Sequence, residues 1–310
     1  MAKPKIFIDG EHGTTGLQIR ERLASRTDIE QLTIPHADRY SIERRTEMLR
    51  AADIAILCLP DDASRESVAL AEGANTRFID ASSAFRTAPD WVFGYPELTA
   101  GQPERITSAK YVSNPGCYAT GAIALLRPLI EHGLMSADFP VTINAVSGYT
   151  GGGKQMIAQM EDATREDAIA TAIFTYALTL KQKHVPEIMS RSGLTRRPIF
   201  TPSVGRYAQG ILLQIPLHLD MLTGEQTATT IHAELSAHYE GQNVVQVVAI
   251  DAANSFTRLD PEALNGTNNM KLYVFGDAST GHVNLVAQLD NLGKGASGAA
   301  VQNLDLMLGN

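Results

Sequence analysis

The stretch "IFIDGEHGTTG", residues 6–16, runs from an apolar strand through a glycine-rich turn into the first residues of a helix. Gly10 permits a sharp turn, Gly13 lets backbone N–H groups approach a pyrophosphate, and Gly16 stands where the positive N-terminus of the helix begins. The spacing is GxxGxxG rather than the commoner GxGxxG, but the motif requires this strand, turn and helix context. The segment therefore predicts a Rossmann-like dinucleotide-binding domain.

Short apolar runs alternate with amphipathic stretches through the first part of the chain. We expect strands at 5–9, 31–34, 53–60, 77–82 and 110–114, and helices at 15–24, 42–52 and 62–74. The run Ile54–Leu59 is apolar without alternation, as is typical of a parallel strand covered on both faces. This series predicts an α/β domain with a parallel sheet.

The pattern changes after residue 116. Strands are expected at 141–148, 197–204, 210–219, 243–250, 270–277 and 281–290, with helices near 153–165, 184–191 and 224–239. Hairpin-like turns join several of these strands, which indicates an α+β domain with a mostly antiparallel sheet. We therefore expect a nucleotide-binding domain at 1–116, joined by a returning helix at 290–310, and a catalytic and oligomerisation domain at 117–289.

Composition excludes several classes of function. The chain has 310 residues, of which 44% are hydrophobic and 19% charged, and a formal charge of −8 without a basic stripe. No apolar run approaches the length of a membrane helix, so neither nucleic acid nor a membrane is an expected partner. Two cysteines cannot build a disulfide framework, and no secretory leader opens the sequence, so we expect a reducing, cytoplasmic setting.

The second stretch that carries chemistry is "SNPGCYATG", residues 113–121. Its Asn-Pro-Gly turn sets Cys117 at the first turn of a predicted helix, and Gly116 leaves room for a substrate beside the sulfur. A free thiol has a pKa of about 8.5, which a helix N-terminus lowers, so this position favours a nucleophile. The other cysteine, Cys58, lies in an apolar run and is predicted to be a core residue.

A nucleophilic cysteine needs a proton partner, and "KQKHVPEIM" offers His184 beside Lys183. If a helix starts near Val185, His184 lies at its N-terminal edge and Glu187 could orient the ring. Arg86, in "DASSAFR", follows a strand of the first domain, where ligands of open α/β sheets gather, and its guanidinium suits a phosphate or a carboxylate.

The segment "PHADRYS" follows the second predicted strand, where ribose is recognised in dinucleotide-binding domains. Asp38 could accept hydrogen bonds from the ribose hydroxyls of NAD. Arg39 beside His36 could instead meet a 2′-phosphate. We favour NADP(H) as the cofactor.

These motifs together resemble a known family. "DGEHGTTG", "DASSAFR", "GYPEL", "SNPGCYATG", "SGYTGGGK", "KHVPEI" and "GKGASGAAVQN" follow the order seen in N-acetyl-gamma-glutamyl-phosphate reductases, and the chain is similar to their short subfamily from end to end. The resemblance implies reduction of N-acetylglutamyl 5-phosphate by NADPH in arginine biosynthesis. It also implies a small-molecule acyl phosphate as partner and a homo-oligomer, either dimer or tetramer.

Site residues follow from the motifs and the resemblance together. Cys117 is predicted to be the nucleophile and His184 the acid/base. Predicted substrate contacts are Arg86, Asn114, Ser147, Lys154 and Arg206; predicted cofactor contacts are Gly10, Gly13, Thr14, Thr15, Gly16, Arg39, Pro60, Ser82 and Gly295; no metal is expected. "SGYTGGGK" and "RYAQG" depart from the patterns of longer members, and these stretches contain Lys154 and Arg206.

Two alternatives stay open. One is another thiol-dependent acyl-phosphate reductase, of the aspartate-semialdehyde dehydrogenase or aminoadipyl-phosphate reductase type, because one methylene in a pocket is worth only about 1–3 kcal/mol. The other is a dinucleotide-sensing protein without turnover, which would leave Cys117 and His184 without a chemical role.

Overall fold

In the computed structural model, which describes residues 2–277 and 279–309, the chain divides into two units. The first comprises the chain up to Pro96, Ala100–Gly116 and the segment from Ala296 onward; the second comprises Glu97–Thr99 and Cys117–Gly295. The chain thus changes unit after Gly116 and again at Ala296, and Glu97–Thr99 belongs to the second unit; the domain bounds expected from the sequence stay a prediction. Residues 1 and 310, which fall in the predicted first domain, lie outside the described residues.

The first unit is built on a six-stranded sheet in which every pair of neighbours is parallel. Its order is β2 (Glu30–Leu32), β1 (Lys5–Asp9), β3 (Ile54–Leu57), β4 (Arg77–Asp80), β6 (Tyr111–Ser113) and β5 (Val92–Phe93). The α-helices that accompany it in the described residues are α1 (Thr14–Leu23), α2 (Ile42–Ala51), α3 (Asp61–Leu70), α4 (Gln102–Ser108) and α10 (Gly298–Leu308).

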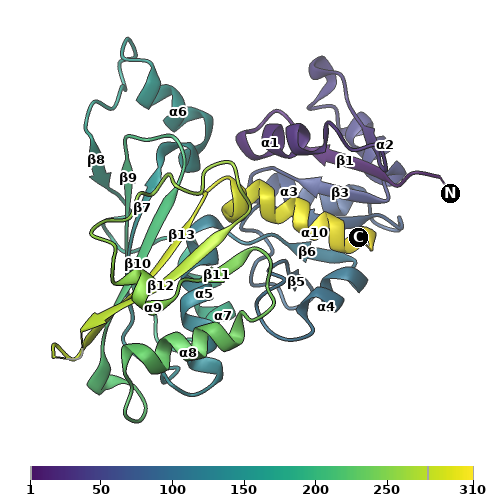
Figure 1. Ribbon diagram of the computed structural model, residues 1–310. Coiled ribbons are helices and arrows are strands. Elements are labelled where there is room, and N and C mark those ends of the chain that lie inside the picture. Colours follow the sequence, from purple (N-terminus) through teal and green to yellow (C-terminus); the bar gives the residue numbers. More distant parts are fainter. Residues whose placement is uncertain (1, 278, 310) are drawn as a thin grey trace. The chain divides into compact units, whose positions relative to one another are not determined.

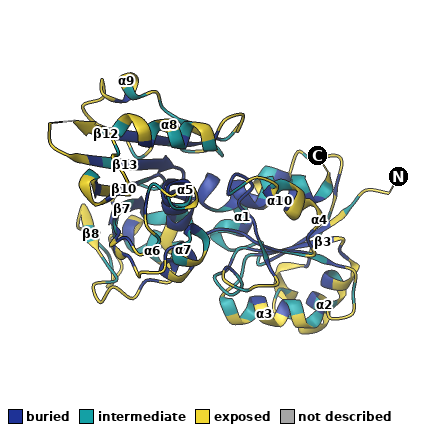
Figure 2. Ribbon diagram, turned by 90° about the horizontal axis from the view of Figure 1, so that it is seen from below, coloured by how far each residue is buried: buried dark blue, intermediate teal, exposed yellow. Residues whose placement is uncertain are grey.

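Both faces of this sheet are covered. Successive side chains of β3 point to opposite faces, so Ile54 and Ile56 enter one core while Ala55 and Leu57 enter the other. Figure 2 shows α1 and α10 on one side of the sheet and α2 and α3 on the other. This double coverage explains why the strand is apolar without alternation.

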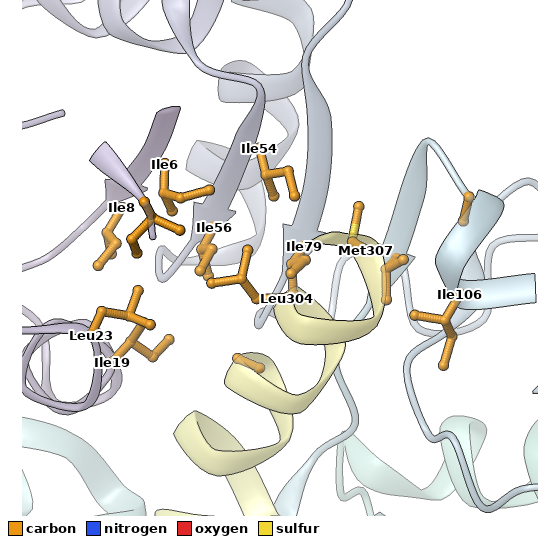
Figure 3. Close-up of a cluster of buried hydrophobic side chains, with 14 residues drawn as sticks. Ile6, Ile8, Ile19, Leu23, Ile54, Ile56, Ile79, Ile106, Leu304 and Met307 are labelled. Carbon is orange, nitrogen blue, oxygen red and sulfur yellow. The ribbon is translucent and has the colours of Figure 1, made fainter. Parts of the chain in front are cut away.

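The C-terminal helix α10 completes one of these cores. Leu304 and Met307 reach the cluster around Ile56, Ile79 and Ile106, which Figure 3 shows on the sheet and on α4. Leu304 is fully buried. The first unit therefore depends on a helix from the far end of the chain.

The second unit is built on a mixed seven-stranded sheet (Figure 1). Its order is β11 (Val245–Val247), β12 (Met270–Asp277), β13 (His282–Leu289), β10 (Ile211–His218), β7 (Thr142–Gly148), β9 (Ile199–Gly205) and β8 (Ile173–Thr175). The pairs β7–β9 and β11–β12 are parallel and the others antiparallel, which confirms the expected mostly antiparallel sheet.

The long helices of this unit pack on one face of the sheet. The helix α5 (Cys117–Glu131) contacts β10 and β13, α8 (Ala228–His238) contacts β11 and β12, and α7 (His184–Ser192) packs on α5 (Figure 1). The unit also contains α6 (Gly153–Glu161) and the short α9 (Ile250–Ala253), whose Ala253 packs with Tyr273 and Val286 on the face opposite α5. Along β10 buried positions alternate with exposed ones such as Gln214 and Pro216, so this part of the second face is left open within the chain.

Several boundaries differ from the sequence prediction for local reasons. The helix predicted at 224–239 begins at Ala228, because Thr227 caps it and exchanges hydrogen bonds with Thr230. The helix predicted at 153–165 ends at Glu161, because Asp162 is extended and its carboxylate accepts the N–H of Thr164. The short elements β5, α4, β8 and α9 carry too little periodicity to be predicted.

Leu304→Ala should lower the free energy of unfolding of the first unit by about 2–5 kcal/mol, because it leaves a cavity in a close-packed core. Urea unfolding followed by circular dichroism measures the change. Val301→Ala, on the same helix but only partly buried, is the matched control and should cost less. Equal losses in the two variants would contradict a core role for Leu304.

Candidate active site

A pocket of about 470 Å³ lies in the second unit. It brings together residues that are far apart in the sequence: the start of α5, the end of β7, the turn before α6 and the segment that leads into α7. The residues that line it are Cys117, Tyr118, Ser147, Gly148, Gly151, Gly152, Met156, Tyr176, Ala177, Lys181, Gln182, Lys183, His184 and Val204. The predicted nucleophile and the predicted acid/base thus share one pocket.

Cys117 is the first residue of α5, which confirms its expected place at a helix N-terminus. The backbone of Gly295 packs against it, and a Cβ at that position would lie 2.8 Å from the Cys117 Cβ. Any larger residue at 295 would therefore displace Cys117 or the segment that contacts it. Gly295 was predicted as a cofactor contact, and in the second unit its observed neighbour is Cys117.

A buried ion pair lies next to this contact. Lys294 Nζ is 2.8 Å from Glu97 Oε2, and each side chain is only 1% exposed. Burial lowers the pKa of Lys294, and the Glu97 carboxylate opposes that shift. The nearby Asp290 carboxylate accepts the N–H groups of Gly266 and Leu292, which further fixes the segment before Gly295.

His184 is the first residue of α7 and is 7% exposed. Its Nδ1 lies 3.0 Å from the side-chain oxygen Oε1 of Gln182, which also accepts the His184 backbone N–H at 2.5 Å. The ring meets Tyr118 edge-on, with centroids 5.6 Å apart. Glu187 is buried one turn along α7, and its predicted role in orienting the ring stays a prediction.

Two tyrosines form one wall of the pocket. Tyr118 donates its hydroxyl to the carbonyl of Ser203 at 3.2 Å, and Tyr176 lines the pocket with it. Burial raises the pKa of both phenols, with smaller contributions from the Cys117 sulfur. Both hydroxyls therefore stay protonated at neutral pH and offer hydrogen bonds without charge.

The predicted substrate residues are divided between the two units. Ser147 lines the pocket at the end of β7. Lys154 is exposed on α6, outside the set of described residues that line it. Arg206 donates to the carbonyls of Met160 and Thr171, at 3.0 and 3.3 Å, and to that of Ile169. Arg206 therefore holds the segment after α6 to the end of β9, and the structure does not bring it to the pocket.

Arg86 and Asn114 belong to the first unit. Arg86 is 7% exposed and donates to the carbonyls of Asn114 and Ala81, each at 3.0 Å. The Asn114 side chain donates to the Ala296 carbonyl and accepts from Asn303, so it ties the returning C-terminal segment to the turn that precedes Cys117. Their contacts with substrate remain predictions.

The glycine-rich turn has the close packing that the motif requires. Gly10 has φ +88°, in the left-handed region that favours glycine. A Cβ on Gly16 would collide with the carbonyl of Gly10, and one on Gly10 with the carbonyl of Cys58. The helix α1 starts after Gly13 without a side-chain cap, so its first N–H groups are suited to an anion.

Among the described residues, the Thr14 hydroxyl is buried without a hydrogen-bond partner. Buried hydroxyls are usually paired, so this atom is suited to a ligand oxygen. Thr15 follows it on α1. An orphaned hydroxyl beside a glycine turn at a helix N-terminus fits the pyrophosphate of a dinucleotide.

The segment after β2 places a basic cluster near the same turn. Arg39 donates to the His36 carbonyl at 2.7 Å and lies 3.3 Å from His36 Nδ1. The His36 ring packs on that of His12, with centroids 4.6 Å apart. Asp38 ends the short helix that contains His36.

Of the other predicted cofactor contacts, Pro60 precedes α3, and Ser82 donates to Asp80 at 2.7 Å. Cys58 follows β3, is half-buried and packs against the core that contains Ile54 and Ile56. Burial raises the pKa of the Cys58 thiol, and the carboxylates of Asp80 and Asp9 add to the shift. The Cys58 thiol is thus held protonated and unreactive, as expected of a core residue.

Comparison with known proteins decides the family. Residues 29–109 match the family described as "Semialdehyde dehydrogenase, NAD binding domain", and residues 117–291 match "Semialdehyde dehydrogenase, dimerisation domain". The chain is 61% identical over 308 residues to the N-acetyl-gamma-glutamyl-phosphate reductase of Brucella suis and 60% identical to that of Brucella ovis, covering 99% of each chain. The chain belongs to the N-acetyl-gamma-glutamyl-phosphate reductase family.

Solved structures show that this reductase family member shares its fold with distant relatives. Aspartate semialdehyde dehydrogenase II from Vibrio cholerae superposes with a TM-score of 0.74 at 16% identity, covering 100% of this chain and 99% of that one. The Candida albicans enzyme, solved with NADP, gives 0.66 at 12% identity, with 99% of each chain covered. These likenesses confirm the predicted α/β domain and its α+β companion.

Sequence reasoning missed most of the pocket of this reductase family member. Tyr118, Tyr176, Lys181 and Gln182 line it, yet none was predicted. Tyr118 directly follows the predicted Cys117, and Lys181 lies three residues before the predicted His184. Their places in the sequence are the only indication of a role that they carried. Gln182 stands in the stretch "KQKHVPEIM" but carried no signal of its own, and Tyr176 lines the pocket from a segment that no motif marks. The described helices include none with the length and hydropathy of a bilayer-spanning segment.

Lys294→Met should destabilise the second unit by about 3–5 kcal/mol, because it leaves the Glu97 carboxylate buried without its cation. Urea unfolding measures the loss. The double variant Glu97→Leu/Lys294→Met should recover most of the lost stability, and the exposed Lys110→Met should change it by less than about 0.5 kcal/mol. A single variant as stable as the wild type would show that the pair is unimportant.

Proposed function

We propose that the chain reduces N-acetyl-L-glutamyl 5-phosphate to N-acetyl-L-glutamate 5-semialdehyde with NADPH, releasing phosphate, as a step of arginine biosynthesis. The observation that carries the proposal is the placement of Cys117 at the N-terminus of α5 in one pocket with His184. Relatives about 60% identical over nearly their whole length are named for this activity.

The first unit fits the cofactor. Gly10, Gly13 and Gly16 would hold the pyrophosphate, with the Thr14 hydroxyl as a further donor. Arg39 and His36 would bind the 2′-phosphate, which favours NADP(H) over NAD(H). Thr15, Pro60, Ser82 and Gly295 remain proposed cofactor contacts. When bound, NADPH supplies the hydride that reduces the acyl carbon.

The chain's own residues carry the covalent chemistry. His184 takes the proton of the Cys117 thiol, and the sulfur attacks the acyl carbon of the substrate. The bond between that carbon and the phosphate oxygen breaks, which leaves a thioester on Cys117. After reduction, the carbon–sulfur bond breaks as the aldehyde leaves, and the proton held by His184 returns to the sulfur. One difficult displacement is thereby divided into two easier steps.

The remaining polar residues are assigned by charge and place. Arg86, a buried guanidinium, is proposed to counter the charge of the departing phosphate. Asn114, Ser147, Lys154 and Arg206 were predicted to hold the substrate, and of these Ser147 lines the pocket. The exposed amino groups of Lys181 and Lys183 at the pocket are better placed than Lys154 to meet the substrate carboxylate.

The seven-stranded sheet supports a homo-oligomer, either dimer or tetramer. Its matched family is described as a dimerisation domain, and Ile173 and Ile199 are about half exposed on β8 and β9. Burial of such side chains against a second copy would be favourable. Two free cysteines support a reducing, cytoplasmic setting.

Cys117→Ser should abolish turnover, because an alcohol of far higher pKa does not supply the attacking anion. Mass spectrometry of wild type mixed with N-acetylglutamyl phosphate, without NADPH, should show an acyl adduct on Cys117 that the variant lacks. Cys58→Ser should keep the adduct and lose about 1–3 kcal/mol of stability. Retained turnover in Cys117→Ser would end the covalent mechanism and, with it, the proposed function.

Arg39→Ala should lower the preference for NADPH over NADH by about tenfold to a hundredfold, because a charge-assisted contact to the 2′-phosphate contributes about 1.5–3 kcal/mol. The ratio of kcat/KM values for the two cofactors, compared between wild type and variant, measures the change. An unchanged ratio would remove Arg39 from 2′-phosphate recognition.

A further inference from the structure

Gln182 is a buried side chain in the pocket that the mechanism above does not use. It is 8% exposed and lies two residues before His184. Its Oε1 lies 2.5 Å from the His184 backbone nitrogen and 3.0 Å from Nδ1 of the ring. One carboxamide oxygen thus contacts both the main chain and the side chain of the proposed acid/base.

The orientation of this carboxamide is fixed by chemistry. The His184 backbone N–H can only donate, so the atom that faces it must be the oxygen of Gln182. A flipped amide would set its NH₂ group against that N–H, so the flipped arrangement is excluded.

This orientation selects the tautomer of His184. A carboxamide oxygen carries no hydrogen, so its 3.0 Å contact with Nδ1 is a hydrogen bond only when Nδ1 bears the proton. In the neutral ring, Nε2 then carries the lone pair. The proton that catalysis moves must therefore be exchanged at Nε2.

A turn that contains two residues of positive φ comes just before Gln182 in the chain. Ala177 and Leu180 have φ of 53° and 60°, and the Leu180 N–H donates to the Ala177 carbonyl at 2.8 Å. Residues with a side chain rarely adopt this conformation, and it persists only where the surrounding contacts require it. Arg197 donates to the Leu180 carbonyl at 3.0 Å and anchors the turn. The chain thus accepts strain where it delivers Gln182 to His184.

We propose that Gln182 is a positioning residue: its side-chain oxygen fixes the ring orientation of His184 and keeps the proton on Nδ1, so that Nε2 serves the Cys117 sulfur. The inference rests on the acid/base role proposed above for His184. It assigns a function to a residue for which the motifs gave no signal.

Other titratable and charged groups also surround the ring. Cys117 and Tyr118 come from α5, Tyr176, Lys181 and Lys183 from the segment before α7, and Glu187 from α7 itself. A change at Gln182 alone leaves all six in the chain. The comparison with His184→Ala below separates the contact with His184 from any effect on these groups.

The test measures semialdehyde oxidation by the intact enzyme with phosphate and NADP⁺ over a range of pH. Gln182→Met, which keeps the length and removes the acceptor, should lower kcat by about 10- to 100-fold and change KM by less than about threefold. Gln182→Glu restores the acceptor, so kcat should recover to within about tenfold of wild type. Its carboxylate also favours the protonated ring, which should move the acidic limb of the pH–rate profile up by about one unit.

Three comparisons make the outcome decisive. Gln246→Met, the same change at an exposed position on β11, should leave kcat and the profile unchanged. His184→Ala should be impaired, and Gln182→Met/His184→Ala should be no slower than His184→Ala if Gln182 acts only through the ring. A folded Gln182→Met with wild-type kcat, or a further loss in the double variant, overturns the inference and leaves the proposed function intact.

The remaining outcomes are also informative. If His184→Ala keeps the wild-type rate, the acid/base role fails and the inference fails with it. If Gln182→Met does not fold, the Gln182→Glu profile decides alone, and an unshifted acidic limb overturns the positioning role.

Discussion

The close contact between Gly295 and Cys117 is the steric constraint on which the proposed active site depends. A Cβ at residue 295 would lie 2.8 Å from that of Cys117, so the segment before the C-terminal helix must pass the nucleophile as bare backbone. The Lys294–Glu97 ion pair and the Asp290 carboxylate fix that segment on its approach. Polar groups buried in the second unit thus help to set the position of Cys117.

Most of the fold followed from local pattern. The parallel strands of the first unit were predictable because residues such as Ile54 and Leu57 face cores on opposite sides of one sheet, which produces a continuous apolar run. The short strands β5 and β8 were not, because two or three residues carry no measurable period. The helix boundary at Ala228 depended on a hydrogen bond of Thr227 that composition does not reveal.

The candidate active site was likewise only partly predictable from the sequence. Cys117 and His184 were predicted because a turn before a helix and a histidine at a helix start are sequence-local features. Gln182 was not predicted, although it lies two residues before His184, because the sequence does not reveal which group its side chain meets. Tyr176 was not predicted, because only the folded second unit brings its segment to the pocket. Arg206 was predicted to contact the substrate, but its guanidinium donates to backbone carbonyls and does not line the pocket. Charge and proximity in sequence do not state where a side chain points.

The return of α10 to the first unit has a consequence for synthesis on the ribosome. Strands β1, β3 and β4 emerge early, yet Leu304 and Met307, which cover Ile56 and Ile79, are translated after the segment Cys117–Gly295 of the second unit. Until then one face of the parallel sheet stays open, and exposed apolar surface of this kind promotes aggregation and chaperone binding. The nucleotide-binding unit can therefore close only after the second unit has been made. Premature termination would yield a chain with most of its strands and an unsealed core.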